Sequence, residues 1–320
     1  MNRPRRSHAG FTLVELLVAI TVTVVLAGLL IAVTSGALNI WQRAQSRLTM
    51  NSQVRVALDL LTRDLQAAVN SSAAGTSFAV DILSSDQLGK HNWRLEDPRI
   101  KPDDTTSLHA LANTTILTEQ RIANSRFGQS GVWLRFITTN VATGGSLPTA
   151  VSYQINRRPV SGAVTGPNQA PARYSLFRSK VNSDDTFKNG YDLTAAAYAS
   201  LSDAPLGEAL CDNVVDFGVW CYAREGNGTL TRLYPDADND RSFHGSAQVG
   251  APSASRYPVV IDVMLRVLND SGATKLDPIE LGRVDRPPAY ATDSDWWWGV
   301  VDAESRTFTL RVEVMGASPP

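Results

Sequence analysis

An apolar stretch near the N-terminus constrains this chain more than any other feature. Residues 11–33 carry one charged side chain, that of Glu15, and directly follow residues 1–10, which hold three arginines and no acid. At ~1.5 Å per residue, a helix over residues 11–33 is about 34 Å long, enough to cross a hydrocarbon core of ~30 Å. The basic flank predicts that this end stays in the cytoplasm and that residues 40–320 are exported.

The composition excludes several classes of function. The 320 residues have 30 basic and 31 acidic side chains, so the chain lacks the basic surplus typical of nucleic-acid-binding proteins. The four histidines are isolated, and the sequence has no zinc-binding spacing, no nucleophile elbow and no phosphate-binding loop. We therefore expect no enzyme activity and no cofactor. An ordinary secretory signal, cleaved after the apolar stretch, is poorly matched by residues 32–36.

The six residues GFTLVE at positions 10–15 closely resemble the signal sequence of type IV pilins and type II secretion pseudopilins. The resemblance covers residues 1–40. It implies that an aspartyl prepilin peptidase/methyltransferase cleaves between Gly10 and Phe11 and methylates the new N-terminus. It also implies a single-pass protein of the inner membrane, with a cytoplasmic N-terminus and a periplasmic domain.

Glu15 has a physical interpretation of its own. A carboxylate in a membrane helix costs at least ~2.5–3.5 kcal/mol unless it is paired. After cleavage, the ammonium group of Phe11 on a neighbouring helix is a natural partner, which gives Glu15 a role in assembly. The Phe11 ammonium of the same chain is a second partner, and an interfacial carboxylate that reaches the lipid headgroups is the alternative.

The helical pattern continues beyond the membrane segment to about Val69. One apolar stripe recurs at spacings of three and four residues or their multiples: Ala44, Leu48, Val54, Leu58, Leu61, Leu65 and Ala68. The pattern predicts a leader at residues 1–10, a transmembrane half-helix at 11–40, an amphipathic spine at 41–70 and an exported globular domain at 77–320.

Beyond residue 76 the apolar pattern changes to a period of two, which is typical of half-buried antiparallel strands. The predicted strands are residues 132–137, 151–155, 174–176, 213–222, 230–234, 257–269 and 307–315. Asn227-Gly228 predicts a hairpin turn. The intervening segments, notably 84–128, 157–171, 179–210 and 270–304, are predicted as long loops. The fold class is therefore α+β: a long N-terminal helix packed on an antiparallel, β-rich pseudopilin domain.

Two further segments narrow the resemblance. Residues 53–68 look like the spine of the J-type minor pseudopilins of type II secretion. The order of the later segments is also similar to that family: an entry at Leu210–Val214, a hairpin, a strand from Pro258 and a final strand at Arg306–Met315. This implies a non-enzymatic subunit that joins other pilin-like subunits in a hetero-oligomeric tip or filament. The alternatives are a minor pilin of a surface fibre, with an adhesion or uptake role, and a membrane-anchored exported domain of unknown activity.

Three features fall outside this interpretation. Asp236, Asp238 and Asp240 have the spacing that opens a calcium loop, but the glycine and glutamate that complete it are missing, so a solvated turn is the alternative. In an extended segment, the run Trp296–Trp298 has at least one ring that is outward or covered by a loop. We expect a long loop packed over the sheet here, with a partner contact as the second interpretation. Cys211 and Cys221 are predicted as free thiols, because an extended strand holds them too far apart for a disulfide.

Overall fold

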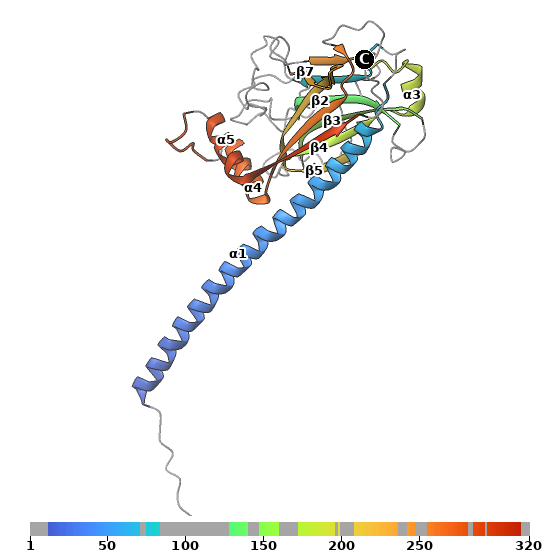
Figure 1. Cartoon of the computed structure of the whole chain (residues 1–320). Helices are drawn as coiled ribbons and strands as arrows, with labels where there is room; N and C mark the ends of the chain where they lie inside the picture. Colours follow the sequence, from blue (N-terminus) through green and yellow to red (C-terminus); the bar gives the residue numbers. More distant parts are fainter. Residues whose placement is uncertain are drawn as a thin grey trace, which may run out of the picture. The chain divides into compact units, whose positions relative to one another are not determined.

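The structure is a computed structural model, and it describes residues 12–70, 75–83, 128–139, 147–159, 172–195, 198, 208–235, 242–246, 255–280, 284–291 and 293–314. The chain divides into two compact units, Met1–Thr49 and Met50–Pro320. Helix α1 (Leu13–Gln66) contributes residues to both. The sheets and the shorter helices belong to the second unit (Figure 1).

In the first unit, the large apolar side chains of α1 are exposed. Leu13, Val25 and Ile40 are representative, with 79%, 63% and 71% of their surface accessible. The most apolar stretch of α1 has a mean hydropathy of 2.9, and none of that stretch is buried. Among the described residues, α1 is the one helix long and apolar enough to cross a membrane. An apolar helix surface of this length is more stable in contact with the hydrocarbon core of a membrane than with water.

The second unit contains two antiparallel sheets, as the period-two pattern predicted. One has six strands in the order β5-β4-β3-β2-β1-β8: β5 (Ala209–Asp212), β4 (Ala172–Lys180), β3 (Thr149–Pro159), β2 (Gly128–Thr138), β1 (Phe78–Leu83) and β8 (Ser242–Gly245). The other has four in the order β10-β9-β6-β7: β10 (Ser305–Glu313), β9 (Val260–Leu268), β6 (Val214–Arg224) and β7 (Leu230–Tyr234). Together with α1 they make the α+β fold that the sequence predicts.

The core joins the two sheets to the distal part of α1. The residues that it buries along α1 and just beyond its end follow spacings of three and four: Met50, Val54, Ala57, Leu61, Leu65 and Ala68. They pack in one cluster with Phe136 of the six-stranded sheet and Phe217 of the four-stranded sheet. The predicted stripe was wrong at its proximal end. Ala44 and Leu48 are exposed, and the buried stripe begins at Met50.

The end of α1 is tied to the end of strand β2. The backbone N–H of Val69 donates to the carbonyl of Ile137 at 2.8 Å, and that of Thr139 donates to Ala67 at 3.0 Å. A backbone that pairs with a strand cannot continue the helical hydrogen bonds. The helix therefore ends at Gln66, earlier than the predicted Val69.

Three helices lie in segments that were predicted as loops. They are α3 (Ser183–Lys188), α4 (Asp270–Glu280) and α5 (Asp293–Glu304). Side-chain caps begin two of them, because Asn182 accepts from the N–H of Asp185 at 2.8 Å and Asn269 accepts from that of Gly272 at 2.7 Å. Strand β1 was also absent from the prediction.

The tryptophan run lies in helix α5, so the prediction of an extended loop segment there was wrong. Trp297 is fully buried and meets Tyr174 of β4 edge to face, with the ring centroids 6.1 Å apart. The Trp298 ring lies 4.8 Å from that of Trp297, centroid to centroid. Because residues four apart share a helix face, one helical turn places neighbouring indoles on different faces. Trp297 anchors α5 to the core.

The hairpin and the free thiols were predicted correctly. Strands β6 and β7 pair antiparallel, and Gly228 in their turn has a φ of 84°, a left-handed conformation that suits glycine. Cys211 and Cys221 are both free and buried. Cys211 belongs to β5 and Cys221 to β6, in different sheets, and Asn213 between them has a φ of 60°.

Candidate functional site

The N-terminal end of α1 carries a reciprocal cap between Thr12 and Glu15. The backbone N–H of Thr12 donates to Oε2 of Glu15 at 2.9 Å, and the Thr12 hydroxyl donates to the same oxygen at 3.0 Å. In return, the Glu15 backbone N–H donates to Oγ1 of Thr12 at 3.2 Å. This is a capping box, which satisfies backbone donors that the first turn of a helix leaves free.

The cap changes the interpretation of Glu15. The sequence argument found a partner for this carboxylate only in the ammonium group of Phe11. The structure gives it two donors from Thr12 on the same chain. The signal for this contact was present in the sequence, since Thr12 and Glu15 have the T-x-x-E spacing of a capping box.

Several predicted site residues lie outside the described residues. They are the processing residues Gly10 and Phe11 and the calcium candidates Asp236, Asp238 and Asp240. Within the part of the chain that the structure describes, no group of three or more histidine, cysteine, aspartate or glutamate side chains could hold a metal ion.

A buried polar network joins α1 to the six-stranded sheet, and the sequence argument missed it. Oδ2 of Asp64, a fully buried residue of α1, accepts from Nε of Arg178 at 2.7 Å and from the hydroxyl of Tyr153 at 2.6 Å. The Thr138 hydroxyl donates to the Asp64 carbonyl at 2.9 Å. Three strands therefore hold one turn of the helix by directional bonds, in addition to the apolar stripe.

The titration of this network follows from its burial. Desolvation, together with the charge of Asp64, raises the pKa of Tyr153 well above its usual value, so the hydroxyl remains a donor. Burial lowers the pKa of Arg178, but the hydrogen bond and the charge of Asp64 outweigh that effect, and the net direction is upward. Arg178 therefore stays protonated and Tyr153 stays neutral at neutral pH, as a structural contact requires.

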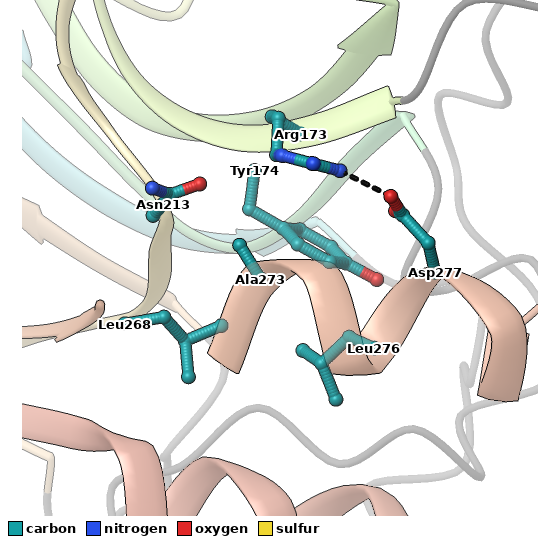
Figure 2. Close-up of a pocket in the computed structure, with 7 residues that line it drawn as sticks. All are labelled: Arg173, Tyr174, Asn213, Leu268, Ala273, Leu276 and Asp277. Carbon is teal, nitrogen blue, oxygen red and sulfur yellow. Dashed lines mark hydrogen bonds and ion pairs between the residues drawn. The ribbon is translucent and has the colours of Figure 1, made fainter. Parts of the chain in front are cut away.

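Figure 2 shows a small hollow between α4 and the start of β4. This hollow is too small for a substrate. Nη1 of Arg173 donates to Oδ2 of Asp277 at 2.6 Å across it. The cavity measures about 10 Å³, which is at the lower limit of what one water molecule needs. The Arg173–Asp277 pair thus fixes helix α4 on the sheet.

Comparison with known proteins identifies a sequence motif at the N-terminus. Residues 5–31 match the prokaryotic N-terminal methylation motif, which is the prepilin cleavage motif of type IV pilins and pseudopilins. The match includes Gly10, Phe11, Thr12 and Glu15 and extends into the exposed apolar part of α1. No curated protein and no solved structure matches the chain.

Proposed function

We propose that this chain is the precursor of a structural subunit of a pilin-like filament. The observation that carries the proposal is the methylation motif at residues 5–31 and its continuation into a helix whose large apolar side chains are exposed. The motif implies processing by prepilin peptidase. Proteins with this N-terminus are generally non-enzymatic subunits.

In the proposed topology, residues 1–10 are a cytoplasmic leader that is removed by cleavage between Gly10 and Phe11. Residues 11–40 then anchor the protein in the inner membrane, residues 41–70 form the spine, and residues 77–320 are the periplasmic domain. The basic leader and the hydropathy of α1 support this orientation.

The finer proposal is a minor pseudopilin of a type II secretion system, of the J type. Its support is the sequence of residues 53–68 and the order of elements after Leu210: strand β6, a hairpin, strand β9 and a final strand β10. Co-purification tests it. A pseudopilin is expected to be recovered with the other pseudopilins of a secretion system, whereas recovery with the subunits of a retractable surface fibre would assign it to a pilus.

Glu15 is the proposed assembly residue. In the precursor its carboxylate bonds Thr12 of the same chain, and cleavage creates an ammonium group on Phe11 in the same layer of the membrane. An ammonium is a stronger partner than two neutral donors, because it neutralises the carboxylate, whereas neutral donors leave a net charge in the membrane, where an unpaired charge costs at least ~2.5–3.5 kcal/mol. Transfer of the Glu15 carboxylate from the Thr12 cap to the Phe11 ammonium of a neighbouring chain therefore favours the assembled state.

The test compares Glu15→Ala with Thr12→Ala. Both substitutions disrupt the capping box, because Thr12→Ala removes the hydroxyl that makes two of its three bonds, but only Glu15→Ala removes the charge. We expect both variants to be cleaved and inserted, and Glu15→Ala to be depleted from co-purified complexes much more strongly than Thr12→Ala. Equal depletion would show that Glu15 acts only as a helix cap, and normal recovery of Glu15→Ala would refute the assembly role.

A further inference from the structure

The outer face of the four-stranded sheet carries an open groove. It measures about 410 Å³. Its lining residues come from three neighbouring strands: Trp220, Tyr222, Asp262, Val263, Thr309, Leu310 and Arg311. Trp220 and Tyr222 are two apart on β6, so they share the face opposite Val219 and Cys221, which are buried in the core. The groove thus lies on the side of the sheet that does not face the core.

The indole of Trp220 lies over Gly218. A Cβ atom at Gly218 would be 2.8 Å from both Cζ3 and Cη2 of the Trp220 ring, and 3.2 Å from Cε of Met264. The ring therefore rests against bare backbone, beside the Met264 methyl group. Trp220 is half-buried and lines the groove, so part of its ring is open to a ligand. Glycine at position 218 makes this placement of the ring possible, since a side chain there would displace the indole.

An ion pair between Arg311 and Asp262 lines the same groove as Trp220. Nε and Nη2 of Arg311 donate to Oδ1 and Oδ2 of Asp262, each at 2.6 Å. The Arg311 guanidinium also lies 5.7 Å from the centroid of the Tyr222 ring. Guanidinium has five donors and a carboxylate has about four acceptor positions, so these two bonds and the hydrogen bond between Tyr222 and Asp262 leave positions free on both groups. The pair can therefore bond a ligand as donor and acceptor while its own geometry stays fixed.

We propose that this groove binds a neutral saccharide, with a pyranose ring stacked on Trp220. A pyranose has an apolar face of C–H groups and a rim of hydroxyls. The exposed part of the indole matches the first, and the Asp262–Arg311 pair with Tyr222 matches the second. The charges of Asp262 and Arg311 cancel, so this pair does not itself attract a phosphate or a carboxylate.

The shape of the groove favours a chain over a single enclosed molecule. Its volume lies within the ~300–1,000 Å³ that is usual for ligand sites, yet it lies across the surface of three strands. A polysaccharide segment needs no enclosure, because one side of it contacts the protein and the other remains in water. A strand or loop of a partner protein is the competing occupant, and the experiment separates the two.

The test measures saturation-transfer NMR of the full-length protein in a zwitterionic detergent that contains no sugar. The probes are cellohexaose and hexa-N-acetylchitohexaose, two neutral saccharides with flat chains. We expect saturable binding of at least one probe, weakened about tenfold by Trp220→Ala. Trp220→Phe should keep a large part of the affinity. Arg311→Lys should weaken binding, because lysine lacks the two-pronged contact to Asp262.

The matched control is Phe187→Ala, which removes an aromatic ring of 69% exposure on α3, outside the groove. It should bind the probes as the unaltered protein does. The proposal is overturned if neither probe binds saturably, or if Trp220→Ala and Phe187→Ala bind alike. Trp220-dependent capture of another pilin-like subunit, without saccharide binding, would also overturn it and would assign the groove to a protein contact. Unchanged thermal unfolding of each variant shows that the comparison concerns folded protein.

Discussion

Asp64 of helix α1 and Arg178 of strand β4 form an ion pair in the interior of the second unit, with 2.7 Å between Oδ2 and Nε. Asp64 is fully buried and its carboxylate also accepts from Tyr153. A buried charge is tolerated only when it is paired and hydrogen-bonded, so this contact fixes which turn of α1 meets the sheet. It complements the apolar stripe, because apolar packing alone lets a helix shift along a sheet more easily than a directional bond does.

Removal of one partner should therefore destabilise the protein strongly. Asp64→Ala leaves Arg178 as an uncompensated buried charge, and we expect a loss of ~3–5 kcal/mol in the free energy of unfolding. The measurement is chemical unfolding followed by tryptophan fluorescence. Asp59→Ala is the matched control, since Asp59 is an exposed aspartate on the same helix, and it should change the free energy of unfolding by less than ~0.5 kcal/mol.

A double substitution separates the buried charge from the packing. Asp64→Leu with Arg178→Met replaces the pair by apolar groups, which is often nearly neutral. We expect the double variant to be more stable than Asp64→Ala. If it is equally unstable, the loss in Asp64→Ala comes from altered packing or from the Tyr153 hydroxyl left without these partners, and not from an unpaired Arg178.

Two truncations test the role of the distal part of α1. A chain that begins at residue 41 keeps the whole buried stripe from Met50 onward and should give a soluble, folded protein. A chain that begins at residue 70 loses Val54, Leu61 and Leu65, each worth ~1.5–3 kcal/mol when fully buried. Their sum is comparable to the ~5–15 kcal/mol stability of a typical domain. Equal melting temperatures of the two proteins would contradict the packing of α1 into this core.

Trp297 should be the most sensitive of the three tryptophans in α5. It is fully buried against Tyr174 and Trp298, and Trp297→Ala should cost ~3–5 kcal/mol in the free energy of unfolding. Phe187→Ala, at an exposed site, should change stability by less than ~0.5 kcal/mol. Thermal unfolding of both variants measures the difference. A small effect at Trp297 would mean that α5 is not anchored to the core.

The two cysteines should be unreactive until the protein unfolds. Burial and the nearby charge of Asp212 raise the pKa of Cys211 to about 12, and burial raises the pKa of Cys221 well above its usual range. Since the thiolate is the reactive form, thiol reagents at pH 8 should label neither residue in folded protein. Denatured, unreduced protein should show two thiols. Labelling of none in the denatured state would indicate a disulfide.

Local patterns predicted the parts of the fold that depend on local physics. The apolar run at residues 11–33, the period-two runs and the Asn227-Gly228 turn each reflect one element, and each can be recognised without the rest of the chain. The free thiols were also predicted, although the reason was incomplete. The bend at Asn213 places Cys211 in the other sheet, whereas the sequence argument used strand length alone.

Long-range contacts explain what the sequence did not predict. Asp64 looks like one more charge on a helix, and its partners Tyr153 and Arg178 lie 89 and 114 residues further along the chain. The helical identity of residues 293–304 was hidden because three adjacent tryptophans favour a strand by propensity. Tertiary burial of Trp297 overrides that preference. The capping box at Thr12 and the asparagine caps at Asn182 and Asn269 were missed although each has a local signal.

The most direct test of the central claim is the intact mass of the protein extracted from membranes of a cell with active prepilin peptidase. The account predicts a mature chain that begins at Phe11, lacks residues 1–10 and carries one additional methyl group on its N-terminus. A Gly10 substitution that blocks cleavage should restore the full mass and serves as the matched control. Recovery of an unmodified chain that begins at Met1, in the presence of the active peptidase, would contradict the account.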